Sequence, residues 1–123
     1  MVARREAANY LLAMDLNVAA RRLAELGNIT RLEIVRLLVR AGDEGLPIGE
    51  LQIRLGIPAS TLAFHLRGLV TEKLVKQQKE GRIVRCTLNF AAVNETLAFV
   101  KENCCAGLPL EELAQRTSAR TVA

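Results

Sequence analysis

The sequence predicts a mainly α-helical domain with one small β-hairpin, and two stretches carry that prediction. Residues 58–73 place Leu62, Leu66 and Leu69 in one row at steps of four and three, which is the spacing of a buried helical face. Residues 74–88 instead alternate apolar with polar side chains around Glu80-Gly81, which is the pattern of two strands and a tight turn. We therefore expect a body of helices with a hairpin attached to it.

Length and composition narrow the class of protein. The 123 residues fit one compact domain, and 50% of them are apolar while only 3% are aromatic, so the core must be aliphatic. No apolar run approaches the roughly 20 residues of a membrane helix, and the first residues lack the apolar segment of a secretory signal. Three cysteines are too few for a secreted disulfide scaffold. We expect a cytoplasmic protein with no membrane partner.

The first elements are less sharply defined than the hairpin. Residues 1–15 form either a short amphipathic helix or a mobile arm, and the sequence leaves both open. Asn17 is the expected N-cap of the next helix, which ends at Gly27. A central core helix is predicted over residues 30–40, because its apolar positions recur at helical spacing. The pair Leu46-Pro47 is a candidate third strand.

A further short helix is predicted at residues 48–55, directly before residues 58–73. Gly56 breaks it, and only Gly56-Ile57-Pro58 link the two helices. Two helices joined so tightly form a helix-turn-helix, whose second helix enters a major groove, and the following hairpin is then a wing. The candidate DNA-binding residues are the outward side chains of the second helix and the cations of the hairpin: Ser60, Thr61, Phe64, His65, Arg67, Lys79, Arg82 and Arg85.

Positive charge concentrates on this helix and hairpin. Residues 67–85 hold six basic and two acidic side chains, an excess of +4 that equals the net charge of the whole chain. A confined excess of this kind indicates a surface for a polyanion such as duplex DNA. The alternatives are a solvated hairpin with ordinary lysines, or a module that binds an acidic protein.

The last predicted helix indicates a homodimer. It spans about residues 91–105, and Val93, Leu97, Val100 and Cys104 form a heptad-like seam along it. In a monomer the terminal helices would cover each other, but a twofold protein can read two half-sites of DNA, which favours the dimer. The winged helix-turn-helix domain is thus expected over residues 16–106, followed by a tail without chemistry at residues 107–123.

Four motifs together resemble one family of regulators. They are Leu-Gly-Asn-Ile-Thr-Arg-Leu-Glu-Ile-Val-Arg-Leu-Leu at residues 26–38, Ser-Thr-Leu-Ala-Phe-His-Leu-Arg-Gly-Leu at 60–69, Lys-Leu-Val at 73–75, and Glu-Gly-Arg at 80–82. This combination is similar to the ArsR/SmtB metalloregulators. The resemblance implies a homodimeric winged helix-turn-helix repressor, not an enzyme, that leaves its operator when a thiophilic ion or another inducer binds. No acid–base pair, phosphate loop or activated nucleophile argues for an enzyme either.

The inducer has to be inferred from the ligand residues of this chain. Residues 46–51, where many family members carry a cysteine box, contain no thiol, and His65 is the only histidine. The pair Cys104-Cys105, within Lys-Glu-Asn-Cys-Cys, resembles the end of the last helix in an arsenic-responsive subgroup. Trivalent arsenic is a soft centre that prefers sulfur. We therefore expect no obligatory cofactor, with a trivalent arsenical as inducer.

Cys86 is the one remaining thiol. Its alternation with Val84 and Leu88 predicts a small buried hydrophobe, although it is kept as a tentative third arsenic ligand. Two thiols alone would suit methyl- or phenylarsenite better than arsenite, because an arsenical with one carbon substituent has two exchangeable positions. The alternative function is a thiol-redox or persulfide sensor, in which Cys86 bridges to one member of the pair.

Overall fold

The computed structural model describes residues 14–108, and the predictions for residues 1–15 and 107–123 fall almost entirely outside that range. In chain order the elements are α2 (Leu16–Leu26), α3 (Ile29–Ala41), a 3₁₀ turn (Gly42–Glu44), β1 (Leu46–Pro47), α4 (Ile48–Leu55), α5 (Ala59–Thr71), β2 (Val75–Glu80), β3 (Ile83–Leu88) and α6 (Phe90–Lys101). The winged helix-turn-helix predicted from the sequence is confirmed. Among the described residues, no helix has the length and apolar character needed to cross a membrane.

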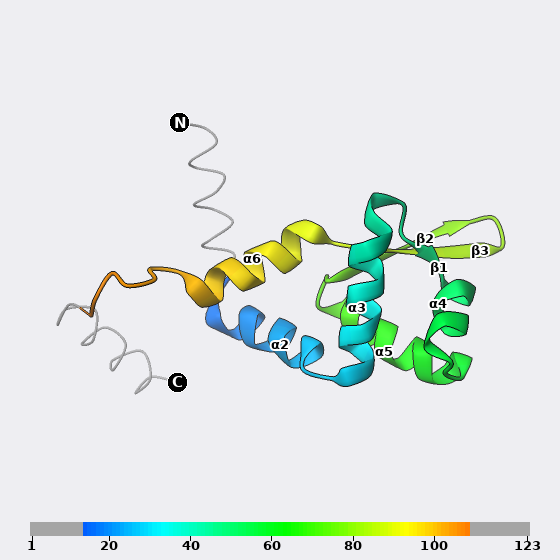
Figure 1. Ribbon diagram of the computed structural model, residues 1–123, viewed down its shortest axis with the longest axis horizontal. Helices are drawn as coiled ribbons and strands as arrows, with labels where there is room; N and C mark the ends of the chain where they lie inside the picture. The colour runs from blue at the N-terminus through cyan, green and yellow to red at the C-terminus, as the bar shows by residue number, and fades with distance from the viewer. Residues whose placement is uncertain (1–13, 109–123) are drawn as a thin grey trace.

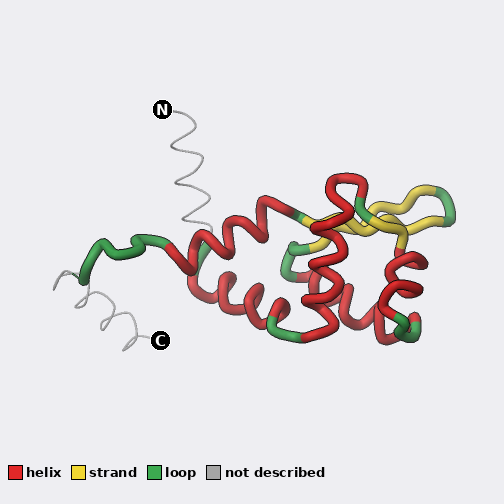
Figure 2. Tube along the Cα trace, viewed as in Figure 1, coloured by secondary structure: helices red, strands yellow, loops and turns green. Residues whose placement is uncertain are grey.

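The elements form an elongated arrangement with two ends of different character (Figure 1). Helices α2 and α6 lie side by side at one end, and the hairpin of β2 and β3 projects at the other (Figure 2). Helices α3, α4 and α5 lie between them and pack on the sheet. Their fully buried side chains form one aliphatic core together with Leu74, which follows α5: Ile34, Leu38, Leu51, Leu62, Leu66 and Leu69.

The sheet has three antiparallel strands in the order β1-β3-β2. Val75 pairs with Leu88 and Glu80 with Ile83, so the two-residue turn is Gly81-Arg82 and lies one residue later than predicted. Gly81 has a φ of 63°, the left-handed conformation that a tight hairpin needs and that glycine adopts without strain. Leu46 pairs with Cys86, which confirms the third strand.

Two helix starts differ from the predictions, and in both a side chain supplies the reason. Helix α2 is capped by Asp15, whose Oδ1 accepts from Val18 N at 2.8 Å, so Asn17 lies within the first turn and is no cap. Helix α3 begins at Ile29, because Asn28 Oδ1 accepts from Arg31 N at 3.1 Å. A carboxylate or amide that bonds a free N–H fixes each start.

Helix α6 is shorter than predicted, which changes where the cysteine pair lies. It ends at Lys101, because Glu102 has a ψ of 137° and leaves the helical path. Asn103 and Cys105 then adopt positive φ angles of 59° and 61°. Cys104 therefore does not extend the seam of Val93, Leu97 and Val100; it lies in a turn beyond the helix. The prediction of a helix to residue 105 was wrong.

Candidate functional site

The outer face of α5 exposes most of the side chains that were predicted to meet DNA. Ser60, Thr61, Phe64 and Arg67 are exposed, whereas the leucine row faces the core. Pro58 occupies the N-cap position, with extended backbone angles, and the small residues Ala59 and Ser60 follow it in the first turn of α5. A helix that begins with short side chains can approach a groove closely.

His65 is placed differently from the other candidate DNA contacts. It is half-buried, and its Nδ1 lies 3.4 Å from Nη1 of Arg31, at the start of α3. Because a guanidinium can only donate, Nδ1 is the acceptor in this contact. The imidazole also meets the ring of Phe64 edge to face, with centroids 5.4 Å apart and an interplanar angle of 69°. His65 thus packs against Phe64 and contacts Arg31, a placement that the sequence alone did not reveal.

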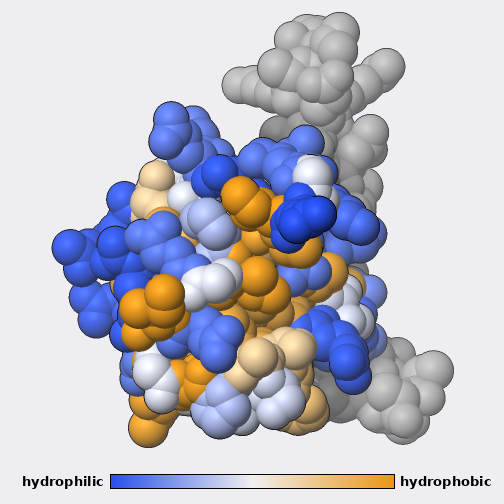
Figure 3. All heavy atoms as spheres, turned by 90° about the vertical axis from the view of Figure 1, so that its right-hand side faces the viewer, coloured by the Kyte–Doolittle hydropathy of each residue, from blue (hydrophilic) through white to orange (hydrophobic). Residues whose placement is uncertain are grey.

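The cations of the wing fall into two groups. Lys79 and Arg82 are exposed near the hairpin turn. Arg85 is half-buried, pairs with the carboxylate of Glu80 at 3.1 Å, and donates from Nη1 to the backbone oxygen of Glu44 at 3.2 Å. Arg85 therefore braces the wing against the 3₁₀ turn. Figure 3 views this end of the molecule and shows hydrophilic side chains crowded around apolar ones that remain uncovered.

Helix α5 ends in a corner that several elements hold. Leu74 N donates to Leu69 O at 2.9 Å and Lys73 N to Val70 O at 3.0 Å, which is the paired pattern of a Schellman motif. Lys73 occupies the left-handed position with a φ of 61°, where glycine is usual, and so lies beyond the end of the leucine row. The backbone oxygens of Glu72, Lys73 and Leu74 all face partners from other helices.

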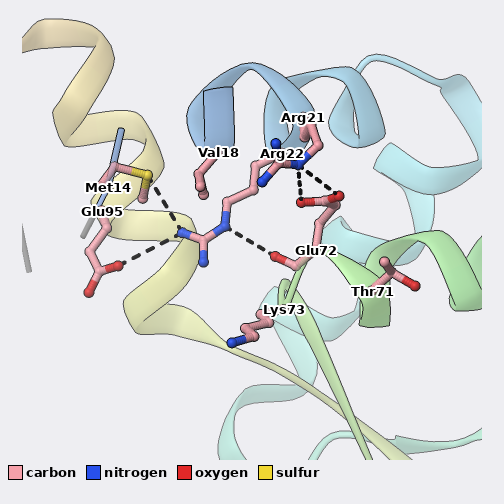
Figure 4. Close-up of a pocket in the computed structure, with 8 residues that line it drawn as sticks. All are labelled: Met14, Val18, Arg21, Arg22, Thr71, Glu72, Lys73 and Glu95. Atoms are coloured by element: carbon pink, nitrogen blue, oxygen red, sulfur yellow. Dashed lines mark hydrogen bonds and ion pairs between the residues drawn. The ribbon is translucent and has the colours of Figure 1, made fainter. Parts of the chain in front are cut away.

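Arg22 of α2 reaches this corner from a buried position (Figure 4). Its Nε donates to Glu72 O at 3.1 Å, and its Nη1 lies 3.8 Å from both the carboxylate of Glu95 on α6 and the sulfur of Met14. Arg21 pairs with the Glu72 carboxylate at 3.4 Å from the exposed side. These residues line an open cavity of about 390 Å³. Sequence analysis missed the role of Arg22. Its position three residues after buried Ala19 places it on the core-facing side of α2, which was the available signal.

Asn89, the N-cap of α6, connects the same corner to the last helix. Its Oδ1 accepts from Ala92 N at 3.2 Å, while its Nδ2 donates to Lys73 O at 2.9 Å. The backbone N of Asn89 donates to Leu74 O at 2.8 Å. The end of α5 and the start of α6 are therefore hydrogen-bonded to one another.

Helix α2 also contacts the middle of α5. A Cβ on Gly68 would overlap the carboxylate of Glu25, so any larger residue at this position would have to displace that carboxylate. The Oε2 of Glu25 lies 3.1 Å from Nε of Arg31, whose N–H donates instead to Glu25 O at 2.8 Å. The buried Oε2 has no hydrogen-bond donor among the described residues and is balanced by the charge of Arg31 alone. Arg31 therefore connects α2 to His65 on α5.

The three cysteines separate into an exposed pair and one buried thiol. The sulfurs of Cys104 and Cys105 lie 3.4 Å apart, beyond the roughly 2.05 Å of a disulfide, and both residues are exposed. Cys86 is fully buried in β3; burial raises the pKa of its thiol from the ordinary 9.0, partly opposed by a hydrogen bond from Gln77. Within residues 14–108, no three metal-ligating side chains gather in one place. The structure thus brings the pair together and does not bring Cys86 to it.

The outer faces of α2 and α6 leave large apolar side chains uncovered. Leu16 is 72% exposed, Leu97 51% and Val100 59%. A groove of about 440 Å³ runs between the two helices, lined mainly by Leu16, Leu23, Phe99, Val100 and Leu108. Of the seam that predicted a homodimer, this surface exposes Leu97 and Val100, whereas Val93 packs against the core.

Comparisons with known proteins agree with the geometry. A family model described as a helix-turn-helix domain matches residues 26–78. The chain is similar to HlyU from Vibrio cholerae N16961, with 32% identity, coverage of 75% of this chain and 99% of that one, and a TM-score of 0.55. It is also similar to an ArsR-like transcriptional regulator from Rhodococcus sp. RHA1, with 28% identity, coverage of 87% and 93%, and a TM-score of 0.62.

A curated relative carries a name that bears on the thiols. An arsenical resistance operon repressor of Halobacterium salinarum, ArsR2, is 36% identical over 70 residues, which are 57% of this chain. The chain spans only 55% of that relative's length. A DNA-binding domain of Mycobacterium bovis, Mb0332, described as a homodimeric winged helix-turn-helix, shares 20% identity with a TM-score of 0.59, covering 73% of this chain and 83% of that one. At that identity the likeness shows the fold alone.

Proposed function

This chain belongs to the ArsR family of winged helix-turn-helix transcriptional regulators, which are not enzymes, and from that premise we propose its function. We propose that it is a cytoplasmic homodimeric repressor, and that a trivalent arsenical releases it from operator DNA. The observation that carries the sensing half is the pair of exposed sulfurs 3.4 Å apart at the end of α6. The exposed outer face of α5 and the cationic wing support the DNA-binding half.

The dimer follows from the apolar surface of α2 and α6. A single chain leaves large apolar side chains exposed at Leu16, Leu97 and Val100, and a second copy of the same surface would cover them. Two copies would present two α5 helices to one face of a duplex. Phosphates would meet Lys79 and Arg82, and base edges would meet Ser60, Thr61 and Arg67.

The thiol pair fits a soft trivalent centre. Thiols condense with the hydroxyl groups of an arsenical and expel water, and Cys104 and Cys105 already hold their sulfurs near enough for one atom to bond both. Cys86 is enclosed in the core and stays only a tentative ligand. Two thiols favour methyl- or phenylarsenite over arsenite, which would retain a hydroxyl group.

Transmission to DNA would run through the corner at the end of α5. Asn89 at the start of α6 bonds Lys73 O, and Arg22 bonds Glu72 O while it lies near Glu95 of α6. A bound arsenical that shifts α6 would therefore displace the donors of these hydrogen bonds, and α5 would move with them. A coupling of about 1–3 kcal/mol, or roughly 5–150-fold in operator affinity, is sufficient for induction.

The test is operator release by arsenite and by methylarsenite, measured with fluorescent duplex and purified dimer. Wild type should release at lower methylarsenite than arsenite. The double variant Cys104→Ser, Cys105→Ser should bind the operator normally and fail to release it, whereas Cys86→Ala, the matched loss of one thiol, should release as wild type does. Release by the double variant would remove the assigned site, and equal sensitivity to both arsenicals would remove the selectivity.

The redox or persulfide alternative uses the same DNA-binding body. It requires Cys86 to bridge to Cys104 or Cys105, and Cys86 is fully buried in β3 while the pair is exposed beyond α6. Release by oxidant or persulfide in metalloid-free medium, lost in Cys86→Ala, would support that alternative.

A further inference from the structure

Phe64 is unusually exposed for a large apolar side chain, which indicates that it does not serve the core. Of the phenylalanines among the described residues, Phe90 and Phe99 are half-buried, and Phe64 is 63% exposed. It lies in the middle of the outer face of α5, one turn after Ser60 and one turn before Arg67, so the surroundings are polar. A large apolar group isolated there contributes little to the core.

The ring is nevertheless held in place. The imidazole of His65 packs edge to face against it, with centroids 5.4 Å apart, and Nη1 of Arg31 lies 3.4 Å from Nδ1 of that imidazole. Arg31 is in turn fixed by Glu25 of α2, through the 2.8 Å bond to its backbone oxygen and the adjacent carboxylate. A supported aromatic ring binds with a smaller loss of conformational freedom than a free one.

We propose that Phe64 reads a thymine in each operator half-site, by apolar contact with the thymine C5-methyl group in the major groove. The inference rests on the proposed DNA binding and adds a sequence preference to it. In the major groove only thymine presents a methyl group, whereas guanine, cytosine and adenine present polar edges. Phe64 cannot hydrogen-bond those edges, so facing them would remove water without replacing it.

The neighbouring residues agree with that geometry. Ala63 and Ser60 are small and exposed, which lets the backbone of α5 approach the floor of the groove. A side chain that wedges between base pairs acts mainly from the minor groove, whereas a recognition helix lies in the major one. Phe64 is therefore assigned a methyl contact and not an intercalating role.

The test removes the methyl group alone. Duplexes are first selected by the full-length protein from a random-sequence pool, and each thymine of the tightest duplex is then replaced by uracil. One thymine per half-site should weaken wild-type binding about fourfold on losing its methyl, the value expected for one buried carbon. Replacing that T·A pair by C·G should cost about 5–150-fold.

Two variants make the test specific. Phe64→Ala should fold normally, since the ring is mostly exposed, and should bind the thymine and uracil duplexes equally. Ile53→Ala, which removes an 81% exposed side chain from α4, should keep the full thymine preference. If no duplex is bound with sequence preference, the proposed function and this inference both fail. If one is bound, but uracil is tolerated at every position or Phe64→Ala keeps the preference, the inference alone is overturned.

Discussion

Arg22 Nε donates to Glu72 O over 3.1 Å, so one side chain of α2 holds the residue at which α5 ends. The two residues are 50 positions apart in the chain. The same guanidinium lies near Glu95 of α6, so a single buried cation of α2 contacts both α6 and the C-cap residue of α5.

Arg22→Met should lower the free energy of unfolding by about 1–3 kcal/mol, because the partly buried Glu72 O loses its donor. Arg21→Met is the matched control: its side chain is 57% exposed, and the loss of its ion pair with Glu72 should cost less than about 1 kcal/mol. Urea unfolding of both variants measures the difference. Equal losses would contradict the assigned role of Arg22. In operator titrations, arsenical should weaken the binding of Arg22→Met by a smaller factor than it weakens the binding of wild type.

Gly68→Ala should stabilise the protein less than Gly49→Ala does, because the added methyl group must displace the Glu25 carboxylate, the end of a flexible side chain, where α2 crosses α5. Gly49→Ala in α4 is the control, since a Cβ there has no neighbour within 4 Å, and it should be neutral or stabilising by up to about 1 kcal/mol. In thermal unfolding, Gly68→Ala should be more favourable to stability in the Glu25→Ala background than in wild type. Strict additivity of the two substitutions would argue against the close crossing.

Cys86 should react far more slowly with a thiol reagent than Cys104 and Cys105, because it is buried and the others are exposed. Burial raises the pKa of Cys86 above the ordinary 9.0, so its neutral thiol is favoured in the folded state. That stabilisation is fully present below pH 9.0 and is lost as pH rises through the folded-state pKa. Wild type should thus lose more stability than Cys86→Ala above pH 9.0 in urea titrations.

Arg82→Ala and Arg85→Ala should affect DNA binding differently. Arg82 is exposed at the hairpin turn, and its loss should reduce the slope of log affinity against log salt by about 0.9 for each phosphate contact removed. Arg85 is already paired with Glu80 and bonded to Glu44 O, so its loss should change the slope less and lower the stability of the wing more. Operator titrations at several salt concentrations, with unfolding of each variant, test this. A larger slope change for Arg85→Ala would contradict it.

The sequence predicted those parts of the fold that local pattern determines. The leucine row of α5, the alternation of the wing strands and the strand at Leu46-Pro47 were all confirmed. Each depends on residues a few positions apart, and core burial follows directly from such spacing.

The features that were missed depend on partners distant in the chain. The inward contact of His65 needs Arg31, 34 residues away, and the role of Arg22 needs Glu72. The end of α6 was also misplaced, since apolar spacing continues to Cys104 although the backbone departs at Glu102. Periodicity reports which positions favour burial, but not where the backbone stops following the helix.

Because α6 ends at Lys101, the two adjacent thiols lie on a turn that no packed layer of residues 14–108 encloses. Cys104 and Cys105 are exposed and take no part in the aliphatic interior, whereas Glu102, Asn103, Gly107 and Leu108 on either side of them line the groove between α2 and α6. For a designer of whole-cell biosensors, residues 104–106 are consequently the natural place to graft other soft-ligand sequences.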